Sequence, residues 1–262
     1  MPEMPENPLP DHAVRSDGAT IAYHRTPGKS PGVVFLTGFR SDMEGSKALA
    51  LEDFCRARGQ AFLRFDYFGH GASSGDFVDG TIGRWAADAV FALDTLTDGP
   101  QVLVGSSMGG WLMLLAALKR PERIVGLLGI AAAPDFTEDL IPAELSSEQH
   151  ATLEKNGAVA IPNCYDEGDP YLITKALLDD GRDHLLLRKP INLNLPVRLI
   201  QGLKDEDVPW QTALKIQEKL SSDDVEITFV KDGTHRLSEP HDLDRLTDLL
   251  ASLLAKIEQD GL

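Results

Sequence analysis

Short continuous runs of apolar residues alternate along the chain with longer stretches in which apolar residues recur every three or four positions. The continuous runs fall at residues 33–36, 61–65, 102–104, 124–133, 197–200 and 225–230. The stretches with helical spacing fall at residues 46–58, 81–96, 108–119, 211–220 and 243–257. A short strand pair is expected around residues 19–25, before the alternation begins. Continuous apolar strands separated by helices predict an α/β fold, with a mostly parallel sheet covered by helices on both faces.

The alternation is interrupted once, between about residues 135 and 193. This stretch contains several X-Pro pairs and two short helical patterns, at residues 147–156 and 171–180. Ligands of open parallel sheets bind at the C-terminal ends of the strands. We therefore expect the stretch to be a small insertion that forms a lid over this edge, within a single domain at residues 13–262. The proline-rich residues 1–12 are expected to be a mobile lead.

Composition restricts the possible partners. The chain has 41 acidic and 25 basic residues and a formal net charge of −16, which argues against binding to nucleic acid or to an anionic membrane surface. No apolar stretch approaches the roughly 18 residues of a membrane-spanning helix. Cys55 and Cys164 form no metal-binding or redox motif, and no motif requires a metal or an organic cofactor. The first residues resemble neither a secretory signal nor a transit peptide, so we expect a cytoplasmic protein.

The most informative motif lies at residues 105–109, which read GSSMG and match G-x-S-x-G. The motif follows an apolar run and opens a helical stretch, and this strand–turn–helix context is that of a nucleophile elbow. Ser107 is therefore the predicted nucleophile. The backbone N–H of Met108, at the helix N-terminus, is a predicted donor to an oxyanion. A second G-x-S-x-G match, at residues 71–75, is not followed by a helical run, so we interpret its Ser73 as a loop residue.

A serine nucleophile needs a histidine that accepts its proton and an acid that orients this histidine. With a nucleophile elbow, the order along the chain is serine, acid, histidine. Asp205 and His235 each follow a predicted strand, so both are expected at the same sheet edge as Ser107. Asp207 and Asp135 remain alternative acids.

Three further residues bear on the same site. His241, just after Pro240, is the alternative histidine. His70, in a loop expected beside the site, is interpreted as structural. The loop after the first apolar run reads TGF at residues 37–39, and the Phe39 N–H is the predicted second oxyanion donor, because Gly38 lets the backbone turn this amide inward.

Several stretches carry a resemblance to known proteins. They read TGF at 37–39, KALA at 47–50, RFDY at 64–67, DGPQ at 98–101, GSSMGGWLML at 105–114, and KD at 204–205 with VPW at 208–210. The chain resembles the α/β-hydrolase superfamily over about residues 18–258. Within it, the chain resembles the mitochondrial palmitoyl-protein thioesterases that also cleave acyl-glucuronide esters, and their bacterial relatives. This resemblance implies a triad of Ser107, Asp205 and His235.

The resemblance implies hydrolysis of esters or thioesters of a small molecule, or of an acylated protein. A general short-chain carboxylesterase, or another α/β-hydrolase reaction such as carbon–carbon bond hydrolysis or acyl transfer, remains an alternative. A catalytically silent binding protein on the same fold is a further hypothesis. Dehalogenases and dienelactone hydrolases are disfavoured, because they would have Asp or Cys in place of Ser107.

Overall fold

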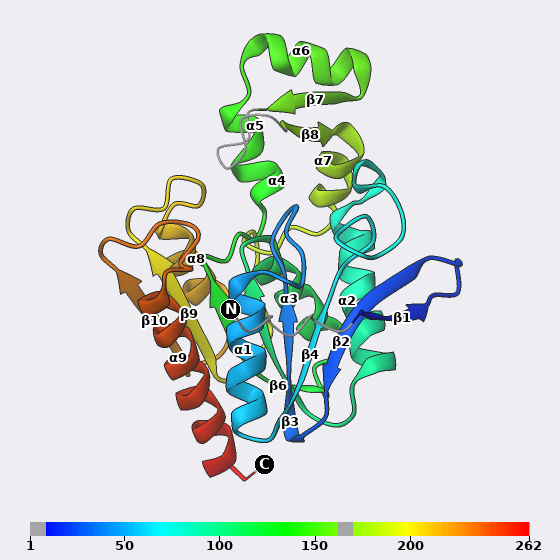
Figure 1. Ribbon diagram of the computed structural model, residues 1–262. Coiled ribbons are helices and arrows are strands. Elements are labelled where there is room, and N and C mark those ends of the chain that lie inside the picture. Colours follow the sequence, from blue (N-terminus) through cyan, green and yellow to red (C-terminus); the bar gives the residue numbers. More distant parts are fainter. Residues whose placement is uncertain (1–8, 162–169, 262) are drawn as a thin grey trace, which may run out of the picture.

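The computed structural model describes residues 9–161 and 170–261. An eight-stranded sheet with the strand order β1-β2-β4-β3-β5-β6-β9-β10 forms the centre of the molecule (Figure 1). The strands are β1 (Asp11–Val14), β2 (Thr20–Thr26), β3 (Lys29–Leu36), β4 (Gln60–Phe65), β5 (Gln101–Ser106), β6 (Ile124–Ile130), β9 (Val197–Gly202) and β10 (Val225–Val230). The six neighbouring strands β4, β3, β5, β6, β9 and β10 are parallel to one another. Strand β2 is antiparallel to β4, and β1 is antiparallel to β2.

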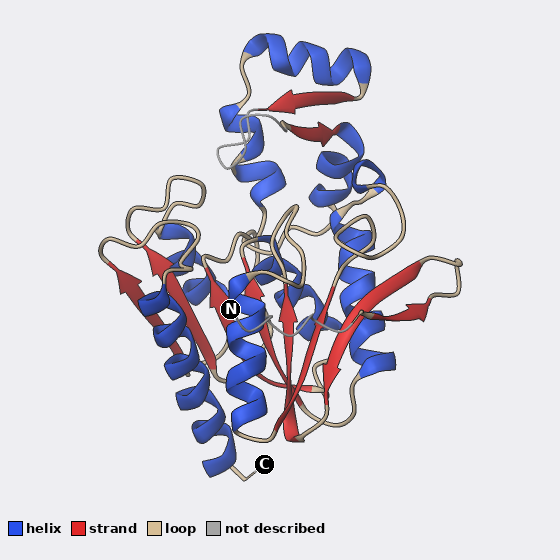
Figure 2. Cartoon of the chain, in the orientation of Figure 1, coloured by secondary structure: helices blue, strands red, loops and turns tan. Residues whose placement is uncertain are grey.

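Helices cover both faces of this sheet (Figure 2). They are α1 (Ser46–Ala57), α2 (Ile82–Leu96), α3 (Met108–Lys119), α8 (Gln211–Lys219) and α9 (Pro240–Gln259), with a short 3-10 helix, η1 (Phe77–Asp79). Helices α1 and α9 contact each other on one face, and α2 and α3 contact each other on the other. The predicted α/β fold with a mostly parallel sheet is confirmed.

The central strands divide their side chains between two hydrophobic clusters, one on each face. In β3, Val33 and Phe35 pack in the cluster with α1 and α9, whereas Val34 and Leu36 pack in the cluster with α2 and α3. Successive side chains of a strand point to opposite faces, so a strand covered on both sides must be apolar at every position. This explains why the strands appear in the sequence as continuous apolar runs.

Two predicted boundaries at the start of the chain need correction. The predicted lead at residues 1–12 includes Asp11 and His12, which belong to β1 and pair with Tyr23 and Ala22. Residues 1–8 of this lead lie outside the described residues. Strand β3 begins at Lys29, four residues before the apolar run. Lys29 at its start pairs with Gln60, and the register shifts before Val33, so the first residues of the strand leave no apolar pattern.

The stretch between β6 and β9 projects beyond the C-terminal ends of the strands (Figures 1 and 2). It contains α4 (Phe136–Asp139), α5 (Ile141–Glu144), α6 (Ser147–Asn156), β7 (Ala158–Ile161), β8 (Tyr171–Thr174) and α7 (Lys175–Arg182). The helix predicted at 147–156 is confirmed. The helix predicted at 171–180 is wrong in its first four residues, which form β8 and pair with β7. The Thr174 hydroxyl accepts a hydrogen bond from the Leu177 N–H, so helix α7 begins only after this cap.

Asp135 ties together the two ends of this stretch. Its carboxylate is fully buried and accepts hydrogen bonds from the backbone N–H groups of Leu186 (2.7 Å) and Leu187 (2.8 Å). Burial raises the pKa of this carboxyl, and the two backbone donors counteract the rise. Asp135, one of the alternative acids, thus forms its hydrogen bonds at the place where the chain leaves and re-enters the sheet.

Candidate active site

The turn between β5 and α3 holds Ser107 in a backbone conformation that few residues adopt. Its φ of 54° and ψ of −120° depart from those of both strand and helix. The chain segments around it are so close that a Cβ at Gly105 would lie 2.3 Å from the Gly109 carbonyl oxygen, and a Cβ at Gly109 would lie 2.1 Å from that of Leu36. The two glycines of the motif are therefore required by close backbone approach, as in a nucleophile elbow.

Backbone hydrogen bonds on both sides hold this strained turn. The Ser107 N–H donates to the carbonyl of Ile130 at 2.9 Å, and the Ser107 carbonyl accepts from the N–H of Ala133 at 3.0 Å. Because both partners lie at or just beyond the end of β6, the neighbouring strand fixes the position of the serine.

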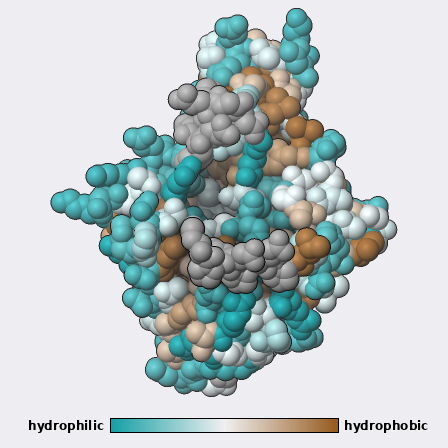
Figure 3. Space-filling view, in the orientation of Figure 1, coloured by the Kyte–Doolittle hydropathy of each residue, from teal (hydrophilic) through white to brown (hydrophobic). Residues whose placement is uncertain are grey.

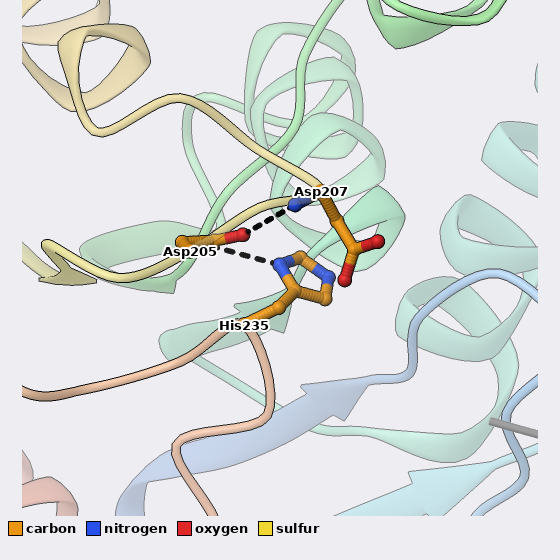
Figure 4. Close-up of side chains that lie close together, drawn as sticks. All are labelled: Asp205, Asp207 and His235. Carbon is orange, nitrogen blue, oxygen red and sulfur yellow. Dashed lines mark hydrogen bonds and ion pairs between the residues drawn. The ribbon is translucent and has the colours of Figure 1, made fainter. Parts of the chain in front are cut away.

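His235 lies between Ser107 and Asp205. Its Nε2 is 3.0 Å from the Ser107 Oγ, and its Nδ1 is 2.9 Å from the Asp205 Oδ2. Figure 4 shows the contact between the imidazole and the Asp205 carboxylate. The structure thus brings together three side chains that lie in loops after β5, β9 and β10 and that the sequence places far apart.

The Asp205 carboxylate is fully buried and held by several donors. Its Oδ1 accepts from the backbone N–H groups of Asp207 (3.0 Å) and Val208 (2.8 Å). Its Oδ2 accepts from the side-chain amide of Gln201 at 2.8 Å as well as contacting His235. Sequence reasoning missed Gln201, although a polar residue at the end of an apolar strand was a signal that could have found it.

The two alternative acids and the alternative histidine have other surroundings. One carboxylate oxygen each of Asp205 and Asp207 and one ring nitrogen of His235 lie within 4.8 Å of one another. In Figure 4 the Asp207 carboxylate lies beside the imidazole, and its backbone N–H binds Asp205. Asp135 is bonded at the ends of the insertion, as described above. His241 is largely exposed on α9 and lies 3.6 Å from Asp242.

The loop after β3 packs directly against the serine. A Cβ at Gly38 would lie 3.4 Å from the Ser107 Cβ, which brings the backbone next to Phe39 close to the serine. Met108, the first residue of α3, follows Ser107 on the other side. Both predicted oxyanion donors therefore belong to segments that adjoin Ser107.

The Phe39 ring connects this loop to the insertion. Its centroid lies 4.9 Å from that of Phe77, 5.7 Å from that of Phe136 and 5.9 Å from that of Tyr171, all with edge-to-face geometry. Phe136 and Tyr171 belong to α4 and β8 of the insertion, so the insertion packs on the loop that adjoins Ser107.

Two cavities meet at Ser107, and Phe39, Tyr171 and His235 also line both. We call the larger one, of about 430 Å³, the polar cavity; its wall includes Arg40, Ser41, Ser46, Lys47, Arg236 and Ser238. We call the smaller one, of about 150 Å³, the apolar cavity; its wall includes Phe136, Leu140, Ile141, Ile161, Ile173 and Val208. Glu144 and Asp207 line the apolar cavity as well.

Lys47 connects α1 to the loop of the histidine. Its Nζ donates to the carbonyl of Arg236, the residue after His235, at 2.5 Å. Burial, and secondarily the charge of Arg236, lowers the pKa of Lys47 to about 8.

The loop after β4 contains the second G-x-S-x-G match and His70. Ser73 lies in this loop, as predicted. Its hydroxyl donates to the carbonyl of Asp66 at 2.6 Å and accepts from the N–H of Ala22 at 2.8 Å, so it anchors the loop. His70 is buried against the rings of Tyr67 and Trp85. Its interpretation as a structural residue agrees with this packing.

Among residues 9–161 and 170–261, one group of side chains has the spacing of metal ligands: Asp205, Asp207 and His235. A metal ion there would compete with the contact between His235 and Asp205 for the same atoms. Within the same ranges, no helix combines the length and the apolar character needed to cross a membrane.

The parallel sheet with helices on both faces and the elbow at the end of β5 define the architecture of an α/β hydrolase. Consistently, residues 33–155 match the family described as alpha/beta hydrolase fold.

Related proteins narrow this class. The chain is 42% identical over 246 residues to "Palmitoyl-protein thioesterase ABHD10, mitochondrial" of Pongo abelii. The matched region covers 93% of this chain and 79% of that protein. The Homo sapiens protein of the same name is 41% identical over 246 residues, with the same coverage. The chain therefore belongs to the α/β-hydrolase family that includes these proteins.

Two solved structures agree with this assignment. Alpha/beta hydrolase domain-containing protein 10 from mouse is 40% identical, with a TM-score of 0.88 over 95% of this chain and 99% of that chain. A putative hydrolase from Agrobacterium vitis S4 is also 40% identical, with a TM-score of 0.89 over 94% of this chain and 99% of that chain.

Proposed function

We propose that this protein hydrolyses carboxylic esters and thioesters through an acyl-enzyme on Ser107. The observation that carries the proposal is the hydrogen-bonded chain from the Ser107 hydroxyl through His235 to the buried Asp205, at 3.0 and 2.9 Å. The strained turn at Ser107 and its place at the C-terminal edge of the sheet support the same role. The name of the related thioesterases adds thioesters to the proposed substrates.

The geometry supports a two-step mechanism. As the Ser107 Oγ attacks the acyl carbonyl carbon, His235 Nε2 takes the hydroxyl proton, and Asp205 stabilises and orients the imidazolium through Nδ1. The N–H groups of Phe39 and Met108 stabilise the oxyanion of the tetrahedral intermediate. When this intermediate collapses, His235 gives the proton to the departing oxygen or sulfur. A water molecule, which gives a proton to His235, then adds to the acyl-enzyme and forms a second tetrahedral intermediate. When this intermediate collapses, His235 returns the proton to the Ser107 Oγ and the acid is released.

We propose that residues 135–193 act as a lid on a single hydrolase domain. Phe136 and Tyr171 from this stretch pack on Phe39, and Phe39 belongs to the loop that adjoins Ser107. The stretch also contributes half of the described residues that line the apolar cavity. This position is suited to select the acyl group and to exclude water from it.

One observation favours a second candidate, a short-chain carboxylesterase. The apolar cavity has a volume of only about 150 Å³, far less than the volume of a palmitoyl chain. Both candidates use the same residues, and both fit small-molecule substrates, whereas an acylated protein fits the thioesterase. The expected cytoplasmic location stays a prediction, since the related thioesterases are named as mitochondrial.

A panel of substrates with Ser107→Ala as the blank tests this proposal. It consists of p-nitrophenyl esters from acetate to palmitate, a palmitoyl thioester and an acyl glucuronide. Cleavage that depends on Ser107, together with labelling of Ser107 by a fluorophosphonate, is the expected result. Preference for the palmitoyl thioester favours the thioesterase, and preference for short esters favours the carboxylesterase. Equal activity of the Ser107→Ala variant, or no cleavage and no labelling, would contradict the proposal.

A further inference from the structure

The two cavities at Ser107 differ in charge as well as in polarity. The charged residues that line the polar cavity are Arg40, Lys47 and Arg236, together with one carboxylate, Asp42. The apolar cavity is lined by Glu144 and Asp207, and among its described lining residues there is no lysine or arginine. A substrate whose carbonyl lies at Ser107 has its acyl chain in one cavity and its leaving group in the other. This placement of the acyl chain and the leaving group rests on the hydrolase function proposed above.

The apolar cavity is the better place for the acyl chain. Its wall is formed by aliphatic and aromatic side chains such as Phe136, Ile141 and Ile173, against which each methylene of an acyl chain gains about 0.8 kcal/mol by leaving water. The polar cavity would have to give up the hydration of its cations and hydroxyls to a hydrocarbon chain. It therefore suits the more polar leaving group.

Glu144 and Asp207 are the two acidic groups among the described residues that line the apolar cavity; Glu144 is exposed to solvent, and Asp207 is partly buried. Glu144 lies at the end of α5 in the insertion, and Asp207 lies in the loop after β9 that contains Asp205. Partial burial, and secondarily the charge of Asp207, raises the pKa of Glu144. The chain thus places like charges from the insertion and from the sheet around one small cavity.

We propose that Glu144 and Asp207 select the acyl group by charge: they exclude acyl chains that end in a carboxylate and admit neutral chains. A chain derived from a dicarboxylic acid would bring a third carboxylate to a cavity whose described lining residues include Glu144 and Asp207 and no lysine or arginine. Repulsion between like charges several ångströms apart, in surroundings less polar than water, lowers binding by about tenfold per fixed carboxylate. Such repulsion discriminates against one class of substrate without improving the other.

A pair of substrates of equal chain length tests the proposal. They are p-nitrophenyl hexanoate and the mono-p-nitrophenyl ester of adipic acid, which differ by a terminal carboxylate. The measured quantity is the ratio of their kcat/KM values in each variant. Because both substrates use Ser107 and the same leaving group, a change in catalytic efficiency common to both cancels in this ratio.

The wild-type protein is expected to prefer the hexanoate by about a hundredfold at low salt, and this preference should shrink as salt is raised. Glu144→Gln and Asp207→Asn should each reduce the preference by about tenfold, and Glu144→Lys should reduce it further. Glu148→Gln is the matched control: it removes the same charge from exposed helix α6 of the insertion, outside the apolar cavity, and should leave the ratio unchanged.

The outcomes separate this inference from the proposed function. If the hexanoate is hydrolysed in a Ser107-dependent manner but the ratio is the same in the wild type, Glu144→Gln and Glu148→Gln, the charge selection is wrong and the hydrolase is not. If no variant hydrolyses the hexanoate or the other esters of the panel, both fail. The Glu144→Lys variant also overturns the inference if it discriminates against the adipate as strongly as the wild type.

Discussion

At the scale of single residues, the site depends on a few positions where the backbone tolerates little else. Ser107 has a positive φ, and the carbonyl oxygen of Leu36 lies where a Cβ of residue 109 would be. The strain is maintained because β3, β5 and β6 hold the turn from three sides. Reactive residues are often found in such conformations, because the surrounding fold fixes their side chains in a productive direction.

Asp205→Asn is expected to lower kcat by about a thousandfold to ten-thousandfold, as expected when the acid that orients a catalytic histidine is lost. An asparagine cannot hold the Nδ1–H tautomer of His235 through the same charge-assisted hydrogen bond. Steady-state hydrolysis of a short p-nitrophenyl ester measures the loss, with thermal unfolding as the check on folding.

Asp135→Asn is the matched control for this prediction. Its amide can accept from only one of the two backbone donors of Leu186 and Leu187 with its single carbonyl oxygen, which should cost about 1–3 kcal/mol of stability. We expect a lower midpoint of thermal unfolding with most of kcat retained. Near-full activity of Asp205→Asn together with loss of activity in Asp135→Asn would show that the acid is misassigned.

Gly109→Ala should disrupt the elbow, although it adds only one methyl group. The added Cβ would lie 2.1 Å from the carbonyl oxygen of Leu36 and 2.5 Å from that of Thr37, and backbone atoms cannot move aside as a flexible side chain can. We expect destabilisation of several kcal/mol, about as large as that of overpacking a core, and loss of fluorophosphonate labelling. Gly157→Ala, at a helix end with a φ of 75° and nothing within 4 Å of the added Cβ, is the control for a glycine substitution that strains the backbone without a steric clash. Full labelling of Gly109→Ala would mean that the turn is not as tight as described.

The residues of the site differ in how far the sequence alone could predict them. Ser107 and His235 follow strands in a recognisable order, and their close approach follows from the parallel sheet. Gln201 is indicated only as a polar residue at the end of an apolar strand, and the sequence does not show that it binds Asp205. The role proposed for Glu144 depends on contacts between segments that the sequence does not align. The sequence pattern alone does not distinguish Asp205 from Asp207, because only Glu206 lies between them, whereas the structure places the Asp205 carboxylate 2.9 Å from His235.

At the scale of elements, the loop from β4 to α2 is held by buried polar side chains that all contact Phe68. The Phe68 N–H donates to the Asp88 Oδ2 at 2.9 Å, and its carbonyl accepts from the Trp85 Nε1 at 3.0 Å. The same carbonyl lies 3.2 Å from the Nδ1 of His70. This loop supports Phe77, which packs against Phe39 next to the candidate site.

Burial shifts the pKa values of Asp88 and His70 in opposite directions. It raises the pKa of Asp88 to about 6, although Arg15 forms an ion pair with this carboxylate. It lowers the pKa of His70 to about 4. Native Asp88 therefore holds its proton over a range in which the unfolded chain has lost it. Native His70 stays neutral over a range in which the unfolded chain is protonated.

These shifts predict two opposing pH dependences of the free energy of unfolding. The contribution of Asp88 is present at low pH and is lost as the pH rises from its ordinary value of 3.8 to about 6. The contribution of His70 is present above its ordinary value of 6.5 and is lost as the pH falls to about 4. Each amounts to at most about 1.4 kcal/mol per pH unit, so the two largely cancel in the wild type between about pH 4 and 6.

Single substitutions should expose each contribution. In Asp88→Asn, stability should fall more steeply than in the wild type as the pH is lowered from 6 to 4. In His70→Asn, which retains a donor to the Phe68 carbonyl, stability should fall less steeply or rise over the same interval. Urea unfolding of the three proteins at several pH values measures the slopes. Parallel slopes in all three would show that these groups titrate normally in the folded protein.

The elements that the sequence predicts well are those buried on both sides. Strands β4, β5 and β9 and helices α2 and α3 follow the apolar pattern closely. Strand β10, a partly exposed edge strand, also has its predicted bounds. The hairpin of β7 and β8 was missed, because a two-stranded sheet covered on one side leaves only a short and irregular pattern. The four residues of β8, Tyr-Leu-Ile-Thr, fit a strand by their β-branched and aromatic side chains, but the helical spacing that follows them obscured this signal.

At the scale of the whole molecule, the sheet and the insertion contribute different parts of the site. The sheet provides Ser107, Asp205 and His235 on a covered and well-packed framework. The insertion provides much of the wall of the apolar cavity and rests on this framework (Figure 1). The surface of the insertion mixes hydrophobic and hydrophilic side chains on the face shown in Figure 3. Its exposed Leu172 lies in β8, which contacts η1 of the main body.

This division predicts that the hydrolase domain can keep its chemistry without the outer part of the insertion. Residues 141–174 can be replaced by a short Gly-Ser linker, because α4 and α7 pack against each other where the new connection would run. Asp135 would still bind Leu186 and Leu187, and the Trp111 Nε1 would still donate to the His184 carbonyl at 3.1 Å. The shortened chain should therefore fold and be labelled by a fluorophosphonate.

Its preference among acyl chains should be lost, because Ile141, Tyr171 and Ile173 would no longer enclose the apolar cavity. Hexanoyl has about four more methylenes than acetyl, each worth about 0.8 kcal/mol when buried, so full burial would favour hexanoate by about a hundredfold in kcat/KM. The measurement is the ratio of kcat/KM for p-nitrophenyl hexanoate and acetate in the full and the shortened chain. A labelled, folded variant that keeps the full ratio would show that the sheet and its loops select the acyl chain and that residues 135–193 do not act as its lid. A ratio near one would assign this selection to the insertion, because both chains share Ser107, His235 and Asp205.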